Sequence, residues 1–539
     1  MKNYTLCFAV LLLSCMHSMA QIPRRVKTSA ALGVSSSDIS GLSVNGKLVI
    51  ATGSDLYVTD GSDAGSVLLM QGVMPRGLVR AGNQLFFIGY SSQDGYELWT
   101  TDGTTAGTHI VKDINPSGNA FSTSNCPGAD NWLAVMNNEV YFPADDGATG
   151  AELWKSDGTA AGTVMVKDIS AYGGSMDYTP CDTRMQRGNW GVVVNNTLYF
   201  TASDSTHGYE IWKSDGTVSG TQLLADLSNG PAGSDPYMFY AFNNRFCFQA
   251  GANFYICDGT AAGITRLSYD VAAQPDYTVL NDTLYFIGNG FVSSPDLYDL
   301  WRTDGTEAGT YSLAQGIRLP QNSPVSNRRF QLTAYHNKLY FTGRNMQATK
   351  GGLWQSDGYA STLTWLHSGG VGKLVAAGNK LYFKSRDSIS HTELWYTDGT
   401  TAGTKQVVYP GANGIQGPIT SSALVINGGV YVLNDSIYYT MMYDSTVRAD
   451  LYRISLFPLS VQELRPHGEV HVYPNPAHTA ITITGTDAAG AEIYSIAGML
   501  QQKQAGGNTI DVSRLAPGLY FLHITTRYNQ QLTERFVKY

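Results

Sequence analysis

The residues best able to do chemistry are aspartates that recur in one short phrase. It reads "ELWKSDGTAAGT" at residues 152–163 and returns, slightly altered, along most of the chain. A ring of such carboxylates could hold metal ions or act as general acids and bases. A catalytic residue is needed only once, however, whereas this aspartate occurs in every repeat, so we interpret it as architecture. The copies are Asp60, Asp102, Asp157, Asp215, Asp258, Asp304, Asp357 and Asp398.

An Asp-Gly-Thr sequence is typical of a tight turn. The carboxylate can accept hydrogen bonds from backbone N–H groups two or three residues later, and glycine adopts φ values that other residues resist. We therefore predict that Asp157, Gly158, Thr159 and Gly162 hold a hairpin together. The copies around Asp60 and Asp357 read "LYVTDGSDAGS" and "LWQSDGYASTL", so the form of those two turns stays open.

Other acidic residues gather in the loops before the repeated phrase, at Asp94, Asp145, Asp146 and Asp204. Calcium prefers such hard oxygen ligands, but a solvated turn is the simpler interpretation. We predict no catalytic residue, bound metal or cofactor. The sequence contains no HExxH, GxSxG, Walker-type or EF-hand motif. The alternative is an active site assembled at a central channel from several repeats, which a motif search does not detect.

The elements that carry these residues are short strands. A second phrase, of which "NTLYFTA" is typical, precedes each copy of the first and occurs nine times in all. Together the phrases predict four antiparallel strands per repeat, which is the blade of a β-propeller. A single blade cannot bury either of its faces, so the blades must stack in a ring. We predict an all-β propeller over residues 36–457, with eight or nine blades and a preference for eight.

Large aromatic residues precede each repeated aspartate by three positions, and we expect them to pack between blades. They are Tyr57, Trp99, Trp154, Trp212, Tyr255, Trp301, Trp354 and Trp395. Trp132 and Trp190 occupy equivalent places in two successive repeats. They could be exposed on a sugar-binding face, but we favour packing between blades. The repeat as a whole resembles the ELWxxDGT repeat of exported bacterial proteins, which implies a propeller-like fold and no particular activity.

The first 20 residues are typical of a secretory signal peptide. Lys2 is followed by an apolar run from Tyr4 to Leu13 and by the small residues "SMA" before Gln21. Cleavage of a lipoprotein type at Cys15 is the alternative. No later stretch reaches the roughly 20 apolar residues of a transmembrane helix. The net charge is −8 and no Lys/Arg-rich run occurs, so neither nucleic acid nor an anionic membrane is an expected partner.

Four cysteines remain after signal removal, an even number in an oxidising compartment. Cys126 and Cys181 occupy matching loops of successive repeats and could join two blades. Cys247 and Cys257 lie on consecutive strands of one blade, in "FCFQAGANFYIC". We predict the pairs 126–181 and 247–257, with buried free thiols as the alternative. A zinc site is not expected, because no CxxC spacing is present.

The last 70 residues or so carry a different pattern. After a linker at 458–468, residues 469–539 alternate in short strands separated by turn residues, which predicts a small β-sandwich. This segment closely resembles the type A sorting domain of the type IX secretion system. The resemblance implies passage through that machinery, then removal of the domain with release or surface attachment. The matching residues are Tyr473, Pro474, Asn475, Pro476, Gly498, Leu515, Gly518, Tyr520, Phe536, Val537 and Lys538.

These observations favour an exported or cell-surface propeller that binds a glycan or a surface protein, rather than an enzyme. The alternative function is a secreted hydrolase or lyase acting on polysaccharide. A structural β-sandwich with a carbohydrate-binding face is the alternative for the tail.

Overall fold

The structure is a computed structural model. It describes residues 24–27, 40–121, 132–171, 173–176, 190–268, 271–290, 297–318, 332–345, 351–386, 392–407, 409–410, 416–417, 424–433, 436–443, 449–455, 471–484, 487–495, 500–526 and 531–539. The predicted signal peptide and linker, together with Cys126 and Cys181, lie outside these ranges. The chain divides into two compact units, Met1–Leu456 and Phe457–Tyr539, which we describe separately.

The first unit repeats one antiparallel sheet, and we number its blades 1 to 9 along the chain. The strands of blades 1 to 5 are β2 (Ser40–Val44), β3 (Lys47–Ala51), β4 (Leu56–Thr59), β5 (Val67–Met70); β6 (Arg76–Ala81), β7 (Gln84–Ser91), β8 (Gly95–Thr101), β9 (His109–Lys112); β10 (Ala134–Met136), β11 (Glu139–Asp145), β12 (Ala151–Ser156), β13 (Val164–Lys167); β14 (Gly191–Val194), β15 (Thr197–Ser203), β16 (Tyr209–Ser214), β17 (Gln222–Ala225); β18 (Pro236–Phe242), β19 (Arg245–Ala250), β20 (Asn253–Cys257) and β21 (Thr265–Ser268).

Blades 6 to 9 follow the same order with small irregularities. Their strands are β22 (Val271–Leu280), β23 (Thr283–Gly290), β24 (Leu297–Thr303), β25 (Tyr311–Arg318); β26 (Thr333–Tyr335), β27 (Lys338–Asn345), β28 (Gly351–Ser356), β29 (Thr364–Ser368); β30 (Gly370–Val371), β31 (Val375–Ala377), β32 (Lys380–Arg386), β33 (Thr392–Thr397), β34 (Lys405–Gln406); and β37 (Leu424–Leu433), β38 (Ser436–Tyr443) and β39 (Ala449–Ser455). The end of β25 also pairs with β27, which joins blades 6 and 7 in one sheet. A short pair, β35 (Tyr409–Pro410) and β36 (Gln416–Gly417), precedes blade 9.

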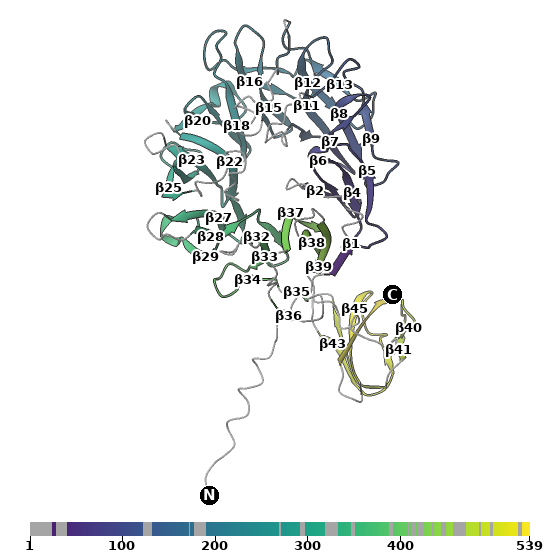
Figure 1. Ribbon diagram of the computed structural model, residues 1–539. Coiled ribbons are helices and arrows are strands. Elements are labelled where there is room, and N and C mark those ends of the chain that lie inside the picture. The colour runs from purple at the N-terminus through teal and green to yellow at the C-terminus, as the bar shows by residue number, and fades with distance from the viewer. Residues whose placement is uncertain are drawn as a thin grey trace. The chain divides into compact units, whose positions relative to one another are not determined.

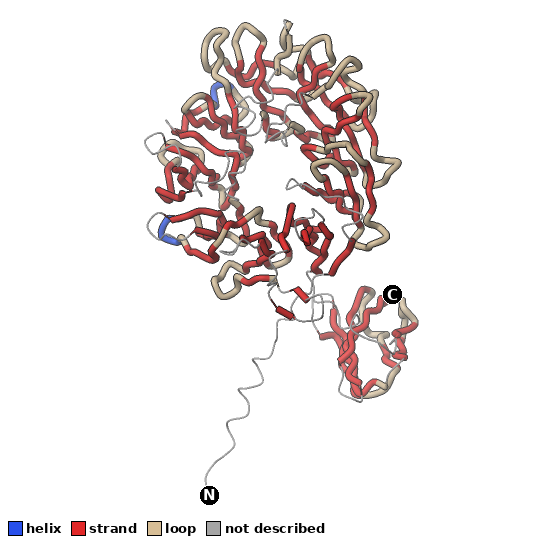
Figure 2. Tube along the Cα trace, in the orientation of Figure 1, coloured by secondary structure: helices blue, strands red, loops and turns tan. Residues whose placement is uncertain are grey.

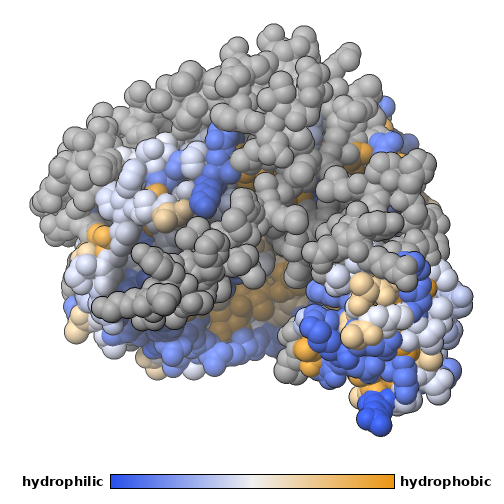
Figure 3. Space-filling view, turned by 90° about the horizontal axis from the view of Figure 1, so that it is seen from below, coloured by the Kyte–Doolittle hydropathy of each residue, from blue (hydrophilic) through white to orange (hydrophobic). Residues whose placement is uncertain are grey.

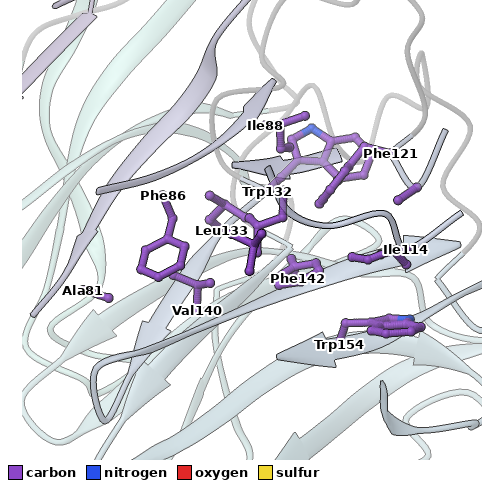
Figure 4. Packing of buried hydrophobic residues seen from close by; sticks show 14 residues of the cluster. Ala81, Phe86, Ile88, Ile114, Phe121, Trp132, Leu133, Val140, Phe142 and Trp154 are labelled. Atoms are coloured by element: carbon purple, nitrogen blue, oxygen red, sulfur yellow. The ribbon is translucent and has the colours of Figure 1, made fainter. Parts of the chain in front are cut away.

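Alternation of side chains along each strand gives every blade two buried faces. In β7, Leu85 and Phe87 pack toward blade 1, whereas Phe86 and Ile88 pack toward blade 3. Figure 4 shows the second of these cores, where Trp132, Leu133, Phe142 and Trp154 of the blade 3 segment meet Phe86 and Ile88. Each such side chain contributes roughly 1.5–3 kcal/mol when fully buried, so the ring is stabilised by what adjacent blades bury together.

The blades close into a ring (Figure 1). The innermost strands of blades 1 to 7 contact one another in order, from β2 to β26. Blade 7 then contacts blade 8 through β28 and β30, β31 contacts β37, and β37 contacts β2 again. Blade 9 takes its fourth strand from the other end of the unit, because β1 (Arg24–Lys27) pairs antiparallel with β39. The all-β propeller is therefore confirmed, but the preference for eight blades is wrong. The ninth "LYF"-like phrase belongs to a separate blade, which the N-terminal strand completes.

The second unit is a β-sandwich. One sheet has the order β40 (His471–Tyr473), β41 (Ala480–Thr484), β44 (Thr509–Asp511), and the other has the order β43 (Leu500–Ala505), β42 (Ala488–Ser495), β45 (Gly518–Thr526), β46 (Gln531–Lys538). Ile481, Ile483 and Ile510 of the first sheet and Leu522 and Phe536 of the second are buried in one core. The predicted fold of the tail is thus confirmed.

Helix is confined, among the described residues, to two short 3₁₀ turns, η2 (Ala261–Gly263) and η4 (Ala360–Thr362), as Figure 2 shows. No helix in the described ranges is long and apolar enough to cross a membrane. On the face that Figure 3 shows, hydrophilic residues predominate along the described rim, whereas hydrophobic residues gather in the hollow at the middle of the view. Val218, in the turn of blade 4, is the most exposed large hydrophobic residue of those described, at 65%.

Candidate functional site

The repeated aspartate is bound inside its own turn. Asp157 Oδ1 accepts hydrogen bonds from the backbone N–H of Thr159 at 2.8 Å and from its hydroxyl at 2.7 Å. The Thr159 hydroxyl in turn accepts from the N–H of Gly162 at 2.9 Å. These bonds to the ionised carboxylate lower the pKa of Asp157. The same bonds form at Asp60, Asp102, Asp215, Asp258, Asp304 and Asp398.

The two glycines of the phrase have different tasks. Gly162 has an ordinary φ, but a Cβ there would overlap the Asp157 carboxylate. Gly158 has a φ of +93°, and in the equivalent turn of blade 4 a Cβ on Gly216 would overlap the Tyr141 hydroxyl of blade 3. The same approach joins Tyr438 of blade 9 to Gly61 of blade 1. The contact that links successive blades therefore also closes the ring.

The turn at Asp357 differs, and its sequence explains why. Tyr359 replaces the threonine, so the Asp357 carboxylate instead pairs with Lys338 Nζ at 2.5 Å. The N–H of Asp357 donates to the Thr362 hydroxyl. The turn at Asp60 keeps the common geometry, because Ser62 supplies the hydroxyl.

The repeated tryptophans lie in cores that adjacent blades share. Trp99, Trp154, Trp212 and Trp354 are buried, whereas Trp301 and Trp395 are partly buried. In blade 3 the ammonium group of Lys112, from blade 2, lies 5.5 Å from the centroid of Trp154 and donates to the Thr163 carbonyl. Lys167 does the same one blade further on, over Trp212. These lysines link blade 2 to blade 3 and blade 3 to blade 4.

Trp132 and Trp190 are buried as well. Their exposed fractions are 7% and 4%, and the Trp190 indole N–H donates to the Trp132 carbonyl across the blade interface. They are packing residues, and no sugar-binding platform is built on them.

Buried glutamates form a site that the sequence analysis missed. The first letter of the "ELW" phrase is glutamate in blades 2, 3, 4 and 8. Glu97, Glu152 and Glu210 of blades 2 to 4 are fully buried, whereas Glu393 of blade 8 is only partly buried. The carboxylate of Glu97 accepts from the N–H groups of Ile114 and Asn115 at 3.0 and 3.3 Å and from that of Ala120 at 3.2 Å. The N–H groups that donate to Glu97 belong to residues 17 to 23 positions later in the sequence. No local sequence pattern therefore predicts these hydrogen bonds.

The glutamates anchor the loops that lead to the next blade. Glu152 holds the backbone of Ile169 and both the backbone and hydroxyl of Ser175, and Glu210 holds blade 4 in the same way through Ser234. Burial raises the pKa of Glu97 to about 7 and that of Glu152 and Glu210 above the usual range, although the hydrogen bonds act in the opposite direction.

The anchored loops also bind the following blade on the same face. The N–H of Asp145 donates to the Ala120 carbonyl at 2.9 Å, and the N–H of Ser203 donates to the Ser175 carbonyl at 2.9 Å. The glutamate lies at the start of the third strand, beside the loop from the second. In blades 2 to 4, the connecting loops and the ends of the second strands therefore meet in a hydrogen-bonded layer.

The acidic loop residues are used within their own loops. Asp145 and Asp146 accept from the N–H groups of Gly147 and Thr149, and Asp94 pairs with the Ser91 hydroxyl. Asp204 Oδ2 lies 2.8 Å from His207 Nδ1. No group of three metal-ligating side chains occurs among the described residues.

The predicted disulfide between Cys247 and Cys257 is wrong. Both cysteines are free and buried. The strand register places Cys247 opposite Ile256 and Cys257 opposite Phe246, so the two thiols lie on opposite faces of the sheet, in different cores. Burial raises the pKa of the Cys257 thiol to about 11 and that of Cys247 further. The predicted Cys126–Cys181 pair falls outside the described residues.

Several of the predicted sorting residues lie around the final strand, whereas Gly498 falls outside the described residues. Asn475 bonds to the backbone of β46, while Tyr520 stacks on Phe536 with ring centroids 5.7 Å apart. The Tyr520 hydroxyl donates to the Ala516 carbonyl. Gly518 is opposite Lys538 in the ladder, and the Lys538 ammonium group donates to the carbonyl of Tyr539. Pro474 and Pro476 flank Asn475.

Comparison with known proteins identifies the second unit. Residues 471–539 match the family described as the secretion system C-terminal sorting domain, which confirms the predicted type IX sorting domain. The chain is thus secreted to the cell surface or the extracellular space, and the domain implies an interaction with the type IX machinery. No curated protein matches the chain.

Three solved structures resemble the chain at low identity. A puromycin hydrolase mutant shares 11% identity (TM-score 0.33; 68% of this chain, 58% of that chain), and oligopeptidase B from Leishmania major shares 10% (TM-score 0.36; 69% and 53%). The β-propeller domain of the Trilobed protease from Pyrococcus furiosus shares 11% (TM-score 0.30; 61% and 98%). The chain spans a little over half the length of the first two.

Proposed function

We propose that the chain is an exported β-propeller that binds a glycan or a surface protein without chemical turnover. The observation that carries the proposal is the layer of glutamate-anchored loops on one face of blades 2 to 4. Glu97, Glu152 and Glu210 fix the connecting loops from beneath, and the loops bond to the next blade. Loops held by a rigid scaffold are where proteins commonly place their binding residues.

The state of the repeated acids supports the same proposal. The carboxylates of Asp102, Asp157 and Asp215 are bound to hydroxyl and N–H groups of their own turns, and the pKa of each is lowered. Such carboxylates are built to stay ionised and to hold a turn. A general acid would need a pKa near the working pH instead.

The experiment is a glycan and surface-protein array with purified chain lacking residues 1–20, tested beside a Glu152→Ala variant. We expect a defined ligand, bound about tenfold or more weakly by the variant, a loss of at least about 1.4 kcal/mol. Glu139→Ala is the matched control, because the Glu139 carboxylate pairs with Lys155 and accepts from the Tyr141 hydroxyl on the same blade, and its described partners include no backbone N–H of a connecting loop. Absence of any ligand, or equal loss in both variants, would count against the proposal.

One observation favours the alternative, a hydrolase acting on polysaccharide. Asp204 Oδ1 accepts from the N–H groups of Thr206 and His207, and Oδ2 orients the His207 ring. A histidine oriented by a carboxylate can serve as a general base. Release of reducing sugar by the purified chain that disappears in His207→Ala would replace the binding proposal with this one.

A further inference from the structure

The side chain of Asn475 behaves like a piece of backbone. Its amide Nδ2 donates to the Arg535 carbonyl at 3.2 Å, and its Oδ1 accepts from the N–H of Val537 at 2.9 Å. These are outward-facing groups of β46, the strand at one edge of its sheet. One side chain thus satisfies a donor and an acceptor that a neighbouring strand would otherwise satisfy.

The flanking prolines explain why a side chain takes this role. A proline has no backbone N–H, so neither Pro474 nor Pro476 can donate to an adjacent strand. Regular pairing resumes at the next residue, where the N–H of Ala477 donates to the Val537 carbonyl at 2.7 Å and the Ala477 carbonyl accepts from Tyr539. Ala477 is fully buried. The segment therefore covers the edge of β46 from Arg535 to Tyr539.

We propose that Asn475 is a positioning residue of the sorting signal: its amide clamps the edge of the final strand, and the secretion machinery recognises that strand only when it is clamped. Residues that are about 60 positions apart in the sequence then form one signal, which exists only in the folded domain. The inference rests on the sorting role of residues 471–539 and is independent of any ligand of the propeller.

Export of the full chain from a bacterium with a type IX system tests whether the secretion machinery recognises the clamped strand. We expect Asn475→Ala to lower the exported fraction about tenfold or more, which corresponds to about 1.4 kcal/mol. Asn508→Ala is the matched control. The Asn508 amide also donates to a carbonyl, that of Ile483, and accepts from an N–H, that of Ala488, but it does so away from β46. The control should be exported nearly as well as the natural chain.

Hydrogen exchange of the purified full chain tests whether the Asn475 amide clamps the edge of β46. Asn475→Ala should accelerate exchange in the peptide 531–539, whereas Asn508→Ala should not. Asn475→Asp gives a signature that a merely structural role would not. Its ionised carboxylate cannot donate to the Arg535 carbonyl, but the protonated acid can, so protection relative to the natural chain should return as the pH falls through the carboxyl pKa.

The outcomes separate the possible failures. Normal export of Asn475→Ala, or equal loss in Asn508→Ala, overturns recognition of the clamped strand. Unchanged exchange in 531–539 for Asn475→Ala, or no recovery of Asn475→Asp at low pH, overturns the clamp. Normal export of a chain lacking 471–539 would instead remove the sorting role on which the inference rests.

Discussion

At the scale of single residues, the repeated phrase forms a tight turn because each of its recurring residues meets a different requirement of that turn, either for hydrogen bonds or for space. The aspartate and threonine bind N–H groups that would otherwise lack partners near the sheet edge. The first glycine adopts a positive φ, and the second leaves room for the aspartate itself. In five turns the first glycine also leaves room for a tyrosine of the preceding blade; these glycines are Gly61, Gly216, Gly259, Gly358 and Gly399. The phrase is therefore repeated because most blades meet the same kind of neighbour.

The second glycine gives a direct test of this account. Gly162→Ala should lower the free energy of unfolding by about 1–3 kcal/mol, because the new methyl group overlaps the Asp157 carboxylate and forces the turn to shift. Urea denaturation measures the change. Gly118→Ala should have little effect, since its Cβ would have only ordinary contacts, 3.7 Å and more. A similar loss in both variants would contradict the steric explanation.

The buried glutamate of blade 2 should make stability depend on pH. The pKa of Glu97 is about 7 in the folded chain and near 4.5 when exposed, so folding favours the protonated form. Its stabilising contribution is full below pH 4.5 and is lost as the pH rises to about 7, a change on the order of 1–3 kcal/mol.

Denaturant unfolding of the natural chain and of Glu97→Gln, compared at several pH values, measures the pH-dependent contribution of Glu97 to the free energy of unfolding. The difference in stability between the two should vary from pH 4.5 to 7 and be constant above about pH 8. Parallel curves across the whole range would show that Glu97 does not titrate in this window.

At the scale of elements, the blade could be predicted from the sequence because its signals are local. Turn aspartates bind residues within five positions, and strand alternation sets both buried faces. Register and long loops are not local. The Cys247–Cys257 pairing failed because a one-residue offset in the hairpin sends adjacent side chains to opposite faces. The glutamate anchors were missed because their partners are distant in sequence.

The ninth blade also depends on a pairing that is distant in sequence, since its fourth strand comes from the far end of the unit. Val26 of β1 is buried among Leu48 and Tyr57 of blade 1 and Tyr431 and Tyr438 of blade 9. Val26→Asp should therefore loosen the ring and lower stability by roughly 2–4 kcal/mol, because it buries an unpaired charge. Thermal unfolding measures this, and Val218→Asp, at a position 65% exposed, should leave the melting temperature almost unchanged.

At the scale of the whole molecule, the two units have separate cores. The propeller core lies between blades, and the sorting domain has its own sandwich core around Ile493 and Leu522. Calorimetry of the full chain should therefore resolve two unfolding transitions. Truncation after Ser455 should remove only one of them and leave the other at the same temperature. A single cooperative transition in the full chain would mean that the units stabilise each other.

The pairing of β1 with β39 brings the two ends of the propeller chain together. The register sets Arg24 opposite Arg453, so the beginning of the first strand runs beside the close of the last. A short peptide could join those ends, and a new start could be cut in an exposed hairpin such as that at Asn137–Asn138. The ring of blades therefore does not depend on where the chain starts. A circularly permuted gene should encode the same propeller, with the sorting domain following the blade that is then last in the sequence.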